Sequence, residues 1–117
     1  MQICKSLVGG KDVAGAGPII DKIYPATGEV IARIESADES ILDTAVTTAS
    51  AAQVEWAARS GHERGRILGQ AAQLLRDNND ALARLEVMDV GKCLDEAMSA
   101  DVPSGADAME YFGALAR

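Results

Sequence analysis

Residues 19–34, IIDKIYPATGEVIARI, decide how the first third of the chain folds. Apolar and polar residues alternate on both sides of the central stretch Pro25–Gly28, and this alternation is typical of half-buried strands. Proline and glycine occupy positions in that stretch where a tight turn favours them. The sequence therefore predicts that Ile19–Tyr24 and Glu29–Ile34 pair as an antiparallel hairpin.

The residues before this hairpin, SLVGG and then KDVAGAG, also read as short extended pieces separated by turns, and they leave room for a second hairpin. Their glycines lack the Gly-x4-Gly-Lys-[Ser/Thr] spacing of a phosphate-binding loop, and no helix is predicted to follow Gly15 or Gly17. We therefore assign these glycines to hairpin turns. The β-hairpin region then covers residues 7–34.

From Ser36 onward apolar residues recur every three or four positions, which predicts helices. A Ser36–Glu39 capping-box pattern precedes the first helix, and a Ser60–Glu63 pattern precedes the second. Residues 78–80 provide the N-cap of a third helix, which Gly91 ends as a C-cap. The apolar stripe of the first helix consists of Ile41, Ala45, Ala49, Ala52 and Trp56.

The fourth helix follows Gly91 and contains Pro103, which removes one backbone donor, so we expect it to be kinked or split there. The predicted fold class is mainly α with N-terminal β-hairpins. Residues 1–117 are expected to form one unit, with four helices in 36–117. Helix-forming residues continue to Arg117, so we expect a fragment that is cut within a helix.

Charge and composition exclude several classes of partner. The 117 residues carry 11 Lys and Arg against 18 Asp and Glu, a net charge of −7, and no basic surface for a nucleic acid. No apolar run approaches the roughly 20 residues that cross a bilayer, and no secretory signal begins the chain, so we expect a cytoplasmic protein without a membrane partner. The helices offer mostly alanine for burial, which gives a marginal core. We therefore expect association through exposed apolar helix faces, such as homo-oligomerisation.

Cys93 is the candidate nucleophile of the chain, because it follows a helix break and lies beside Lys92. The competing interpretation is an incidental thiol, since the single histidine, His62, lies about thirty residues away on another predicted helix. We favour the incidental thiol, and we expect a neutral, solvent-facing ring for His62. The chain shows no complete catalytic constellation.

An acidic cluster near residue 89 allows two further interpretations. Its carboxylates could hold a hard cation or serve a small acidic hydrolase, although such a cluster is more often a solvated surface. The cluster consists of Glu86, Asp89, Asp95 and Glu96.

Five sequence pieces in order, beginning with YPATGEVIARI and ending with DVPSGADAMEYFGALA, resemble the N-terminal region of the NAD(P)-dependent aldehyde dehydrogenase superfamily. The resemblance extends from Leu7 to Arg117 and is strongest to the betaine aldehyde dehydrogenase branch. It implies a partial aldehyde dehydrogenase fold and NAD or NADP as cofactor of the full-length enzyme. It also implies that the catalytic and cofactor-binding residues come from sequence beyond this chain, which is then inactive alone. The alternative is a stand-alone oligomerisation module derived from that fold.

The resemblance places one further site on this chain. Some family members hold a monovalent cation between main-chain carbonyls and an aspartate, and the matching residues here are Ile23, Lys22 and Asp89. Oxygen ligands of this kind suit a hard cation. Tyr24 stands where the family usually has asparagine, which puts the turn geometry in doubt. Cys93 stands where family members often have proline and matches no catalytic position.

Overall fold

The computed structural model describes residues 2–117, and contacts within the chain divide it into two compact units. One unit comprises the chain up to Ala57, and the other comprises Ala58–Arg117. Each unit is described by itself below. Whether the chain folds as one cooperative piece stays a prediction.

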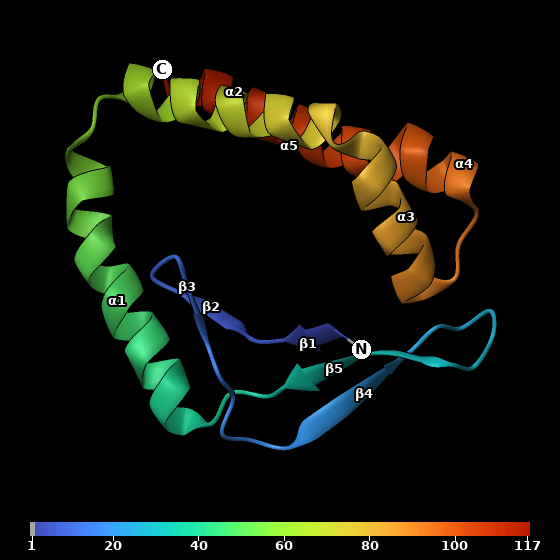
Figure 1. Cartoon of the computed structure of the whole chain (residues 1–117). Helices are drawn as coiled ribbons and strands as arrows, with labels where there is room; N and C mark the ends of the chain where they lie inside the picture. The colour runs from blue at the N-terminus through green and yellow to red at the C-terminus, as the bar shows by residue number, and fades with distance from the viewer. Residues whose placement is uncertain (1) are drawn as a thin grey trace. The chain divides into compact units, whose positions relative to one another are not determined.

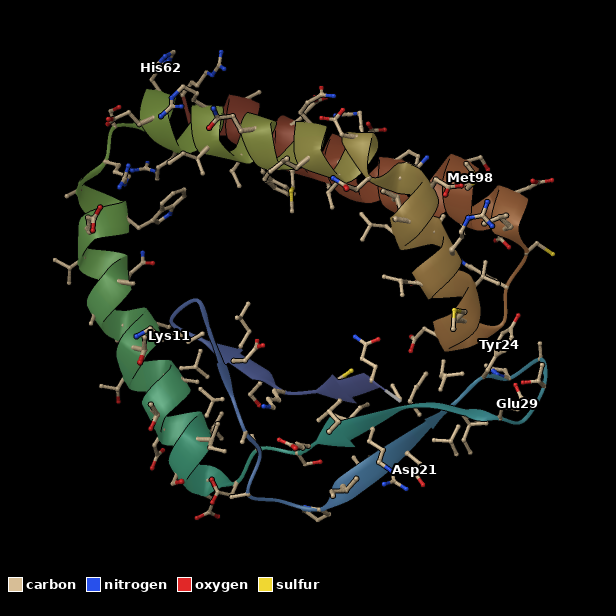
Figure 2. The ribbon with its side chains drawn as sticks, in the orientation of Figure 1. Lys11, Asp21, Tyr24, Glu29, His62 and Met98 are labelled. Atoms are coloured by element: carbon tan, nitrogen blue, oxygen red, sulfur yellow. The ribbon has the colours of Figure 1, made fainter. Side chains whose placement is uncertain are left out.

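The predicted hairpin is confirmed in the first unit, where β4 (Ile19–Ile23) pairs antiparallel with β5 (Val30–Glu35). The turn is closed by the Tyr24 N–H, which donates to the Glu29 carbonyl at 2.9 Å, and by Gly28, whose φ of 77° favours glycine. Figure 2 shows Tyr24 and Glu29 at this end of the hairpin.

A second, shorter hairpin joins β2 (Ser6–Val8) to β3 (Lys11–Val13). Its two connecting residues, Gly9 and Gly10, have φ values of 58° and 77°, and two left-handed residues are what a tight hairpin turn requires. The turn assignment is therefore right for these two glycines.

The same assignment is wrong for Gly15 and Gly17, which lie outside any hairpin turn. The Gly17 N–H donates to the Ser36 carbonyl at 2.9 Å, and the Gly15 N–H donates to the Glu35 carboxylate at 3.1 Å. A side chain on Gly15 would collide with the main chain at residues 35 and 36. These glycines allow one segment of backbone to run close beside another.

An unpredicted strand, β1 (Gln2–Cys4), lies parallel to β5 and completes a sheet of order β1-β5-β4. With only three residues it is too short to show a clear alternation in the sequence.

The helix α1 (Glu39–Ala58) begins two residues later than the predicted cap at Ser36 implies. The carboxylate of Asp38 accepts the Ile41 N–H at 3.0 Å and the Ser40 hydroxyl at 2.8 Å. These two hydrogen bonds lower the pKa of Asp38. The predicted Ser36–Glu39 capping box is wrong, because the main chain of Ser36 is bonded to Gly17 and Pro18 at the end of the sheet.

The second unit consists of α2 (Gly61–Asp77), α3 (Asn79–Val90) and a long helix of three segments. Those segments are α4 (Leu94–Glu96), a π-helical turn η1 (Ala97–Asp101) and α5 (Val102–Leu115). Figure 1 shows α2 and α5 packed side by side.

The caps of α2 and α3 agree with the sequence in part. The Ser60–Glu63 capping box forms at the start of α2, with the Glu63 N–H 3.2 Å from Ser60 Oγ. Gly91, at φ 77°, ends α3 and donates to the Val87 carbonyl at 2.8 Å. The Asn78 side chain makes no cap for α3, because it donates instead to the Leu74 carbonyl of α2 at 2.8 Å.

The irregularity expected near Pro103 takes the form of the π turn that precedes it. The helix continues from Leu94 to Leu115, and the Val102 N–H reaches back five residues to the Ala97 carbonyl. Proline lacks an N–H and crowds the carbonyl four residues before it, and a widened turn accommodates both effects.

Small residues form the centre of the second unit. Gly65 and Ala72 of α2 are buried, as are Ala106 and Gly113 of α5. Across residues 2–117, the apolar side chains that are buried all belong to alanine. Close helix approach therefore replaces the burial of large side chains. In the same part of the chain, no helix combines the length and the apolar character needed to cross a membrane.

Candidate functional site

The outer side of α5 carries an exposed apolar surface, which we call the aromatic face: Tyr111, Phe112 and Leu115. These side chains are exposed to 62%, 61% and 65%, whereas Ala106 and Gly113 of the same helix are buried. The Tyr111 and Phe112 rings meet edge to face, with centroids 5.3 Å apart at 80°. Aromatic pairs prefer this arrangement.

An ionic contact joins α2 to α5 beside this face. The Arg76 guanidinium of α2 donates to the carboxylates of Asp107 at 2.7 Å and Glu110 at 2.8 Å, both on α5. The hydrogen bond to Glu110, followed by that to Asp107, raises the pKa of Arg76. The two acidic residues beside the aromatic face thus share one cation from α2.

Large apolar side chains are exposed on other elements as well. Association of the chain itself stays a prediction. The exposed apolar residues on the helices are Leu42, Val46 and Val54 of α1, Leu74 of α2, and Leu85, Met88 and Val90 of α3. Those on the strands include Ile3, Leu7, Ile19, Ile20, Ile23 and Val30.

Sequence reasoning did not identify the aromatic face. A signal was present, because Tyr111 and Phe112 are adjacent in a helix and consecutive residues point about 100° apart. The two rings could not both face α2, where Gly113 already occupies the contact.

Cys93 is exposed and directly precedes α4, where its side chain makes no cap hydrogen bond. The neighbouring Lys92 ammonium is paired with the Asp101 carboxylate, and this hydrogen bond raises the pKa of Lys92. His62 is exposed in the first turn of α2, and Figure 2 places it at the opposite end of the helix pair from Met98. The structure therefore does not bring the single histidine to the thiol.

The residues of the predicted cation site lie in both units. Asp89 is in the last turn of α3, whereas Lys22 and Ile23 are in β4. The β4–β5 ladder shifts between these two, because Lys22 pairs with Ala32 and Ile23 with Val30. Such a bulge redirects backbone groups, and carboxylate and carbonyl oxygens suit an alkali ion. The cation site stays a prediction.

No group of three His, Cys, Asp or Glu side chains suited to a metal ion occurs between residues 2 and 117. The acidic residues named from the sequence are distributed over two elements: Glu86 and Asp89 lie in α3, and Asp95 and Glu96 lie in α4.

Comparison with known proteins gives consistent results. The sequence model of the aldehyde dehydrogenase family matches residues 13–117. The chain is 51% identical over 100 residues to betaine aldehyde dehydrogenase of Rhizobium leguminosarum bv. trifolii, covering 86% of this chain and 20% of that protein. It is 46% identical over 116 residues to betaine aldehyde dehydrogenase of Vibrio vulnificus, covering 98% of this chain and 24% of that protein.

Among solved structures, the chain is similar to PnpE of Pseudomonas sp. WBC-3, determined in complex with nicotinamide adenine dinucleotide. The TM-score is 0.92 at 33% identity, and the match covers 98% of this chain and 24% of PnpE. The chain thus spans about a fifth to a quarter of the length of the relatives it matches.

Proposed function

Because the chain belongs to the aldehyde dehydrogenase family, as the match over residues 13–117 shows, we propose that it serves as the N-terminal scaffold of an NAD(P)-dependent aldehyde dehydrogenase. The proposed reaction of the whole enzyme is oxidation of an aldehyde such as betaine aldehyde to its acid. The identity of about 50% to betaine aldehyde dehydrogenases carries this proposal. We propose a cytoplasmic location for the same enzyme.

The proposed scaffold supplies ordered structure and leaves the chemistry to the rest of the enzyme. When bound to such an enzyme, a nicotinamide cofactor would supply the acceptor for a hydride from the substrate. In this chain, the Cys93 thiol lies next to a lysine that is engaged by Asp101, and His62 belongs to another helix. We therefore propose that the chain alone has no dehydrogenase activity.

Two assays test this function. The purified 117-residue chain, mixed with betaine aldehyde and NAD or NADP, should reduce no cofactor above the buffer rate. A fusion of this chain to the part of the Rhizobium leguminosarum enzyme that follows its matching stretch should reduce the cofactor, with the unaltered Rhizobium enzyme as control. Turnover by the chain alone would refute the inactivity. A folded but inactive fusion would refute the role as a functional dehydrogenase segment.

The exposed apolar surface favours a second candidate, a stand-alone module that associates with copies of itself. Light scattering during size-exclusion chromatography separates the two candidates. The module requires a dimer or larger species at micromolar concentration, and a monomer would exclude it.

A further inference from the structure

We propose that α3 opens and closes as one unit on the other helices of the second unit, and that two contacts with the π turn η1 hold it closed. At the start of α3, the Asn79 side chain donates to the Met98 carbonyl at 2.9 Å. Two residues beyond its end, the Lys92 ammonium pairs with the Asp101 carboxylate. We call these contacts the first and the second latch. Opening of α3 is a property of the chain itself, whichever function the chain serves.

The π turn leaves the Met98 carbonyl in need of a donor. In an α or a π turn, the N–H that reaches this carbonyl belongs to Val102 or to Pro103. The Val102 N–H donates to the Ala97 carbonyl instead, and proline has no N–H. The Asn79 amide supplies the donor from another helix. The first latch therefore satisfies a part-buried carbonyl for which the last helix has no N–H to offer.

The second latch ties down the loop that follows α3. Gly91 ends the helix, and Lys92 comes directly after it. The side chains of Lys92 and Asp101 are only 24% and 32% exposed, so water screens their ion pair less than it screens a fully exposed pair. The hydrogen bond to Asp101 raises the pKa of Lys92, because it favours the charged ammonium. Both ends of α3 are thus attached to the same five-residue turn.

Between the latches, α3 is packed lightly. Of its twelve residues, all of which the structure describes, Ala83 is the one that is buried. The large apolar side chains of Leu85, Met88 and Val90 are 57%, 40% and 49% exposed. Elements with few buried apolar contacts open at a lower free energy than the whole molecule. The two latches therefore decide how often α3 is closed.

The neighbouring helices α2 and α5 stay together while α3 opens. Their backbones approach closely where Gly65 faces Gly113. Figure 1 shows α3 turning away from the direction of α2. A single residue joins these two helices, Asn78, whose φ of −107° and ψ of 16° are not helical. Gly91, at φ 77°, stands at the other end of α3, and residues at the ends of elements are where hinges absorb a change in backbone angles.

One buried atom makes the first latch reversible. The Oδ1 atom of Asn79 is buried, and among residues 2–117 it has no hydrogen-bond partner. A buried acceptor without a partner is costly, and this cost disappears when opening exposes the amide to water. The first latch therefore holds α3 less firmly than a fully bonded amide would hold it.

Hydrogen exchange of the 117-residue chain at pH 7, followed by NMR for each amide, tests the opening. Amides bonded within α3 run from Leu82, which donates to the Asn78 carbonyl, to Gly91, which donates to the Val87 carbonyl. Their protection should be lower than that of α2 and α5, and similar along the whole of α3. Equal protection in all three helices, or a gradient that falls toward the ends of α3, would refute opening as a unit.

Asn79→Asp separates the first latch from ordinary helix stability. An ionised aspartate cannot donate to the Met98 carbonyl, yet its negative charge at the first position of a helix stabilises that helix. We expect protection along the whole of α3 to fall about 5-fold, as for the loss of one hydrogen bond. Helix stability alone predicts a rise. The opposite signs make this variant decisive.

Lys92→Met tests the second latch, because methionine is of similar length and cannot donate to Asp101. It should also lower protection along the whole of α3, although the substitution lies beyond the end of the helix. Lys92→Arg, which keeps the charge and the donors, should restore protection. Protection in α2 and α5 should stay unchanged in each variant, which shows that the chain remains folded.

Arg84→Gln is the matched control, because it removes an ion pair that joins Arg84 to Asp80 within α3. It should change α3 protection by about 2-fold or less, as is usual for exposed pairs at this spacing. Three outcomes would overturn the latches. In the first, Asn79→Asp leaves or raises the protection of α3. In the second, a latch variant lowers protection only in the nearest turn, or equally in α2 and α5. In the third, Arg84→Gln lowers protection as much as the latch variants do.

Discussion

Gly65 of α2 is the position where adding one methyl group tests the packing of the second unit most directly. Gly65 is buried, and a Cβ atom placed on it would overlap the carbonyl oxygen of Gly113 in α5. A neighbouring backbone atom cannot rotate away as a flexible side chain can. The variant Gly65→Ala therefore forces α2 and α5 apart.

The expected magnitude follows from two opposing contributions. Overfilling a packed contact costs about 1–3 kcal/mol, and the upper end applies because the clash is with backbone. Alanine in place of glycine within a helix returns about 1 kcal/mol. Gly65→Ala should thus lower the free energy of unfolding by about 2 kcal/mol.

Gly69, one turn along the same helix, is the matched control. A Cβ there meets no heavy atom within 4 Å, so Gly69→Ala keeps only the gain in helix propensity and should stabilise the chain by up to about 1 kcal/mol. Urea unfolding followed by circular dichroism measures both changes. Equal effects of the two substitutions would show that α5 does not lie against Gly65.

Four other predictions concern single side chains. Ser60→Ala should lower stability in urea unfolding by about 1 kcal/mol through loss of the α2 cap; an unchanged midpoint would contradict the capping box. Hydrogen bonds from Ser60 lower the pKa of Glu63 in the folded chain. The contribution of Glu63 to stability is therefore full above its unfolded pKa and is lost as the pH falls through the lower folded pKa. Glu63→Gln should make the melting temperature depend less on pH across that acidic range. In the fusion enzyme, adding KCl should raise the melting temperature and Asp89→Asn should abolish that rise; no rise, or a rise that persists in the variant, would exclude this cation site. Cys93 should react with a disulfide reagent at about the rate of a free cysteine peptide, and much faster selective modification would indicate an activated thiol.

The sequence predicted the elements that depend on local chemistry. The hairpin around Pro25–Gly28, the α2 capping box and the Gly91 C-cap all follow from a few neighbouring residues, and the structure contains each. What it did not predict depends on contacts distant in sequence. The parallel pairing of β1 with β5 is one example, and the use of Gly15 beside Glu35 is another.

The candidate site was not predicted for the same reason, because it also depends on contacts between residues distant in sequence. Exposure of the aromatic face depends on which side of α5 meets α2, and that is set by the approach of Gly113 to Gly65 rather than by the apolar pattern alone. The capping error at Ser36 is similar, because its main chain is engaged with residue 17, nineteen positions earlier. The family resemblance predicted more of the fold than the apolar pattern did, because the matching pieces of sequence occur in the same order along the whole fold.

The π turn at Ala97–Asp101 takes up one extra residue within the last helix. Within the turn, the Met98 carbonyl accepts a hydrogen bond from the Asn79 side chain at 2.9 Å. Downstream of it, Asp107 and Glu110 accept hydrogen bonds from Arg76. Deleting one residue within the turn would restore a regular α-helix and leave both sets of contacts near their present phase, whereas deleting one between Val102 and Ala106 would rotate the downstream contacts by about 100°. A single-residue deletion should therefore be tolerated within Ala97–Asp101 far better than in the regular helix that follows it.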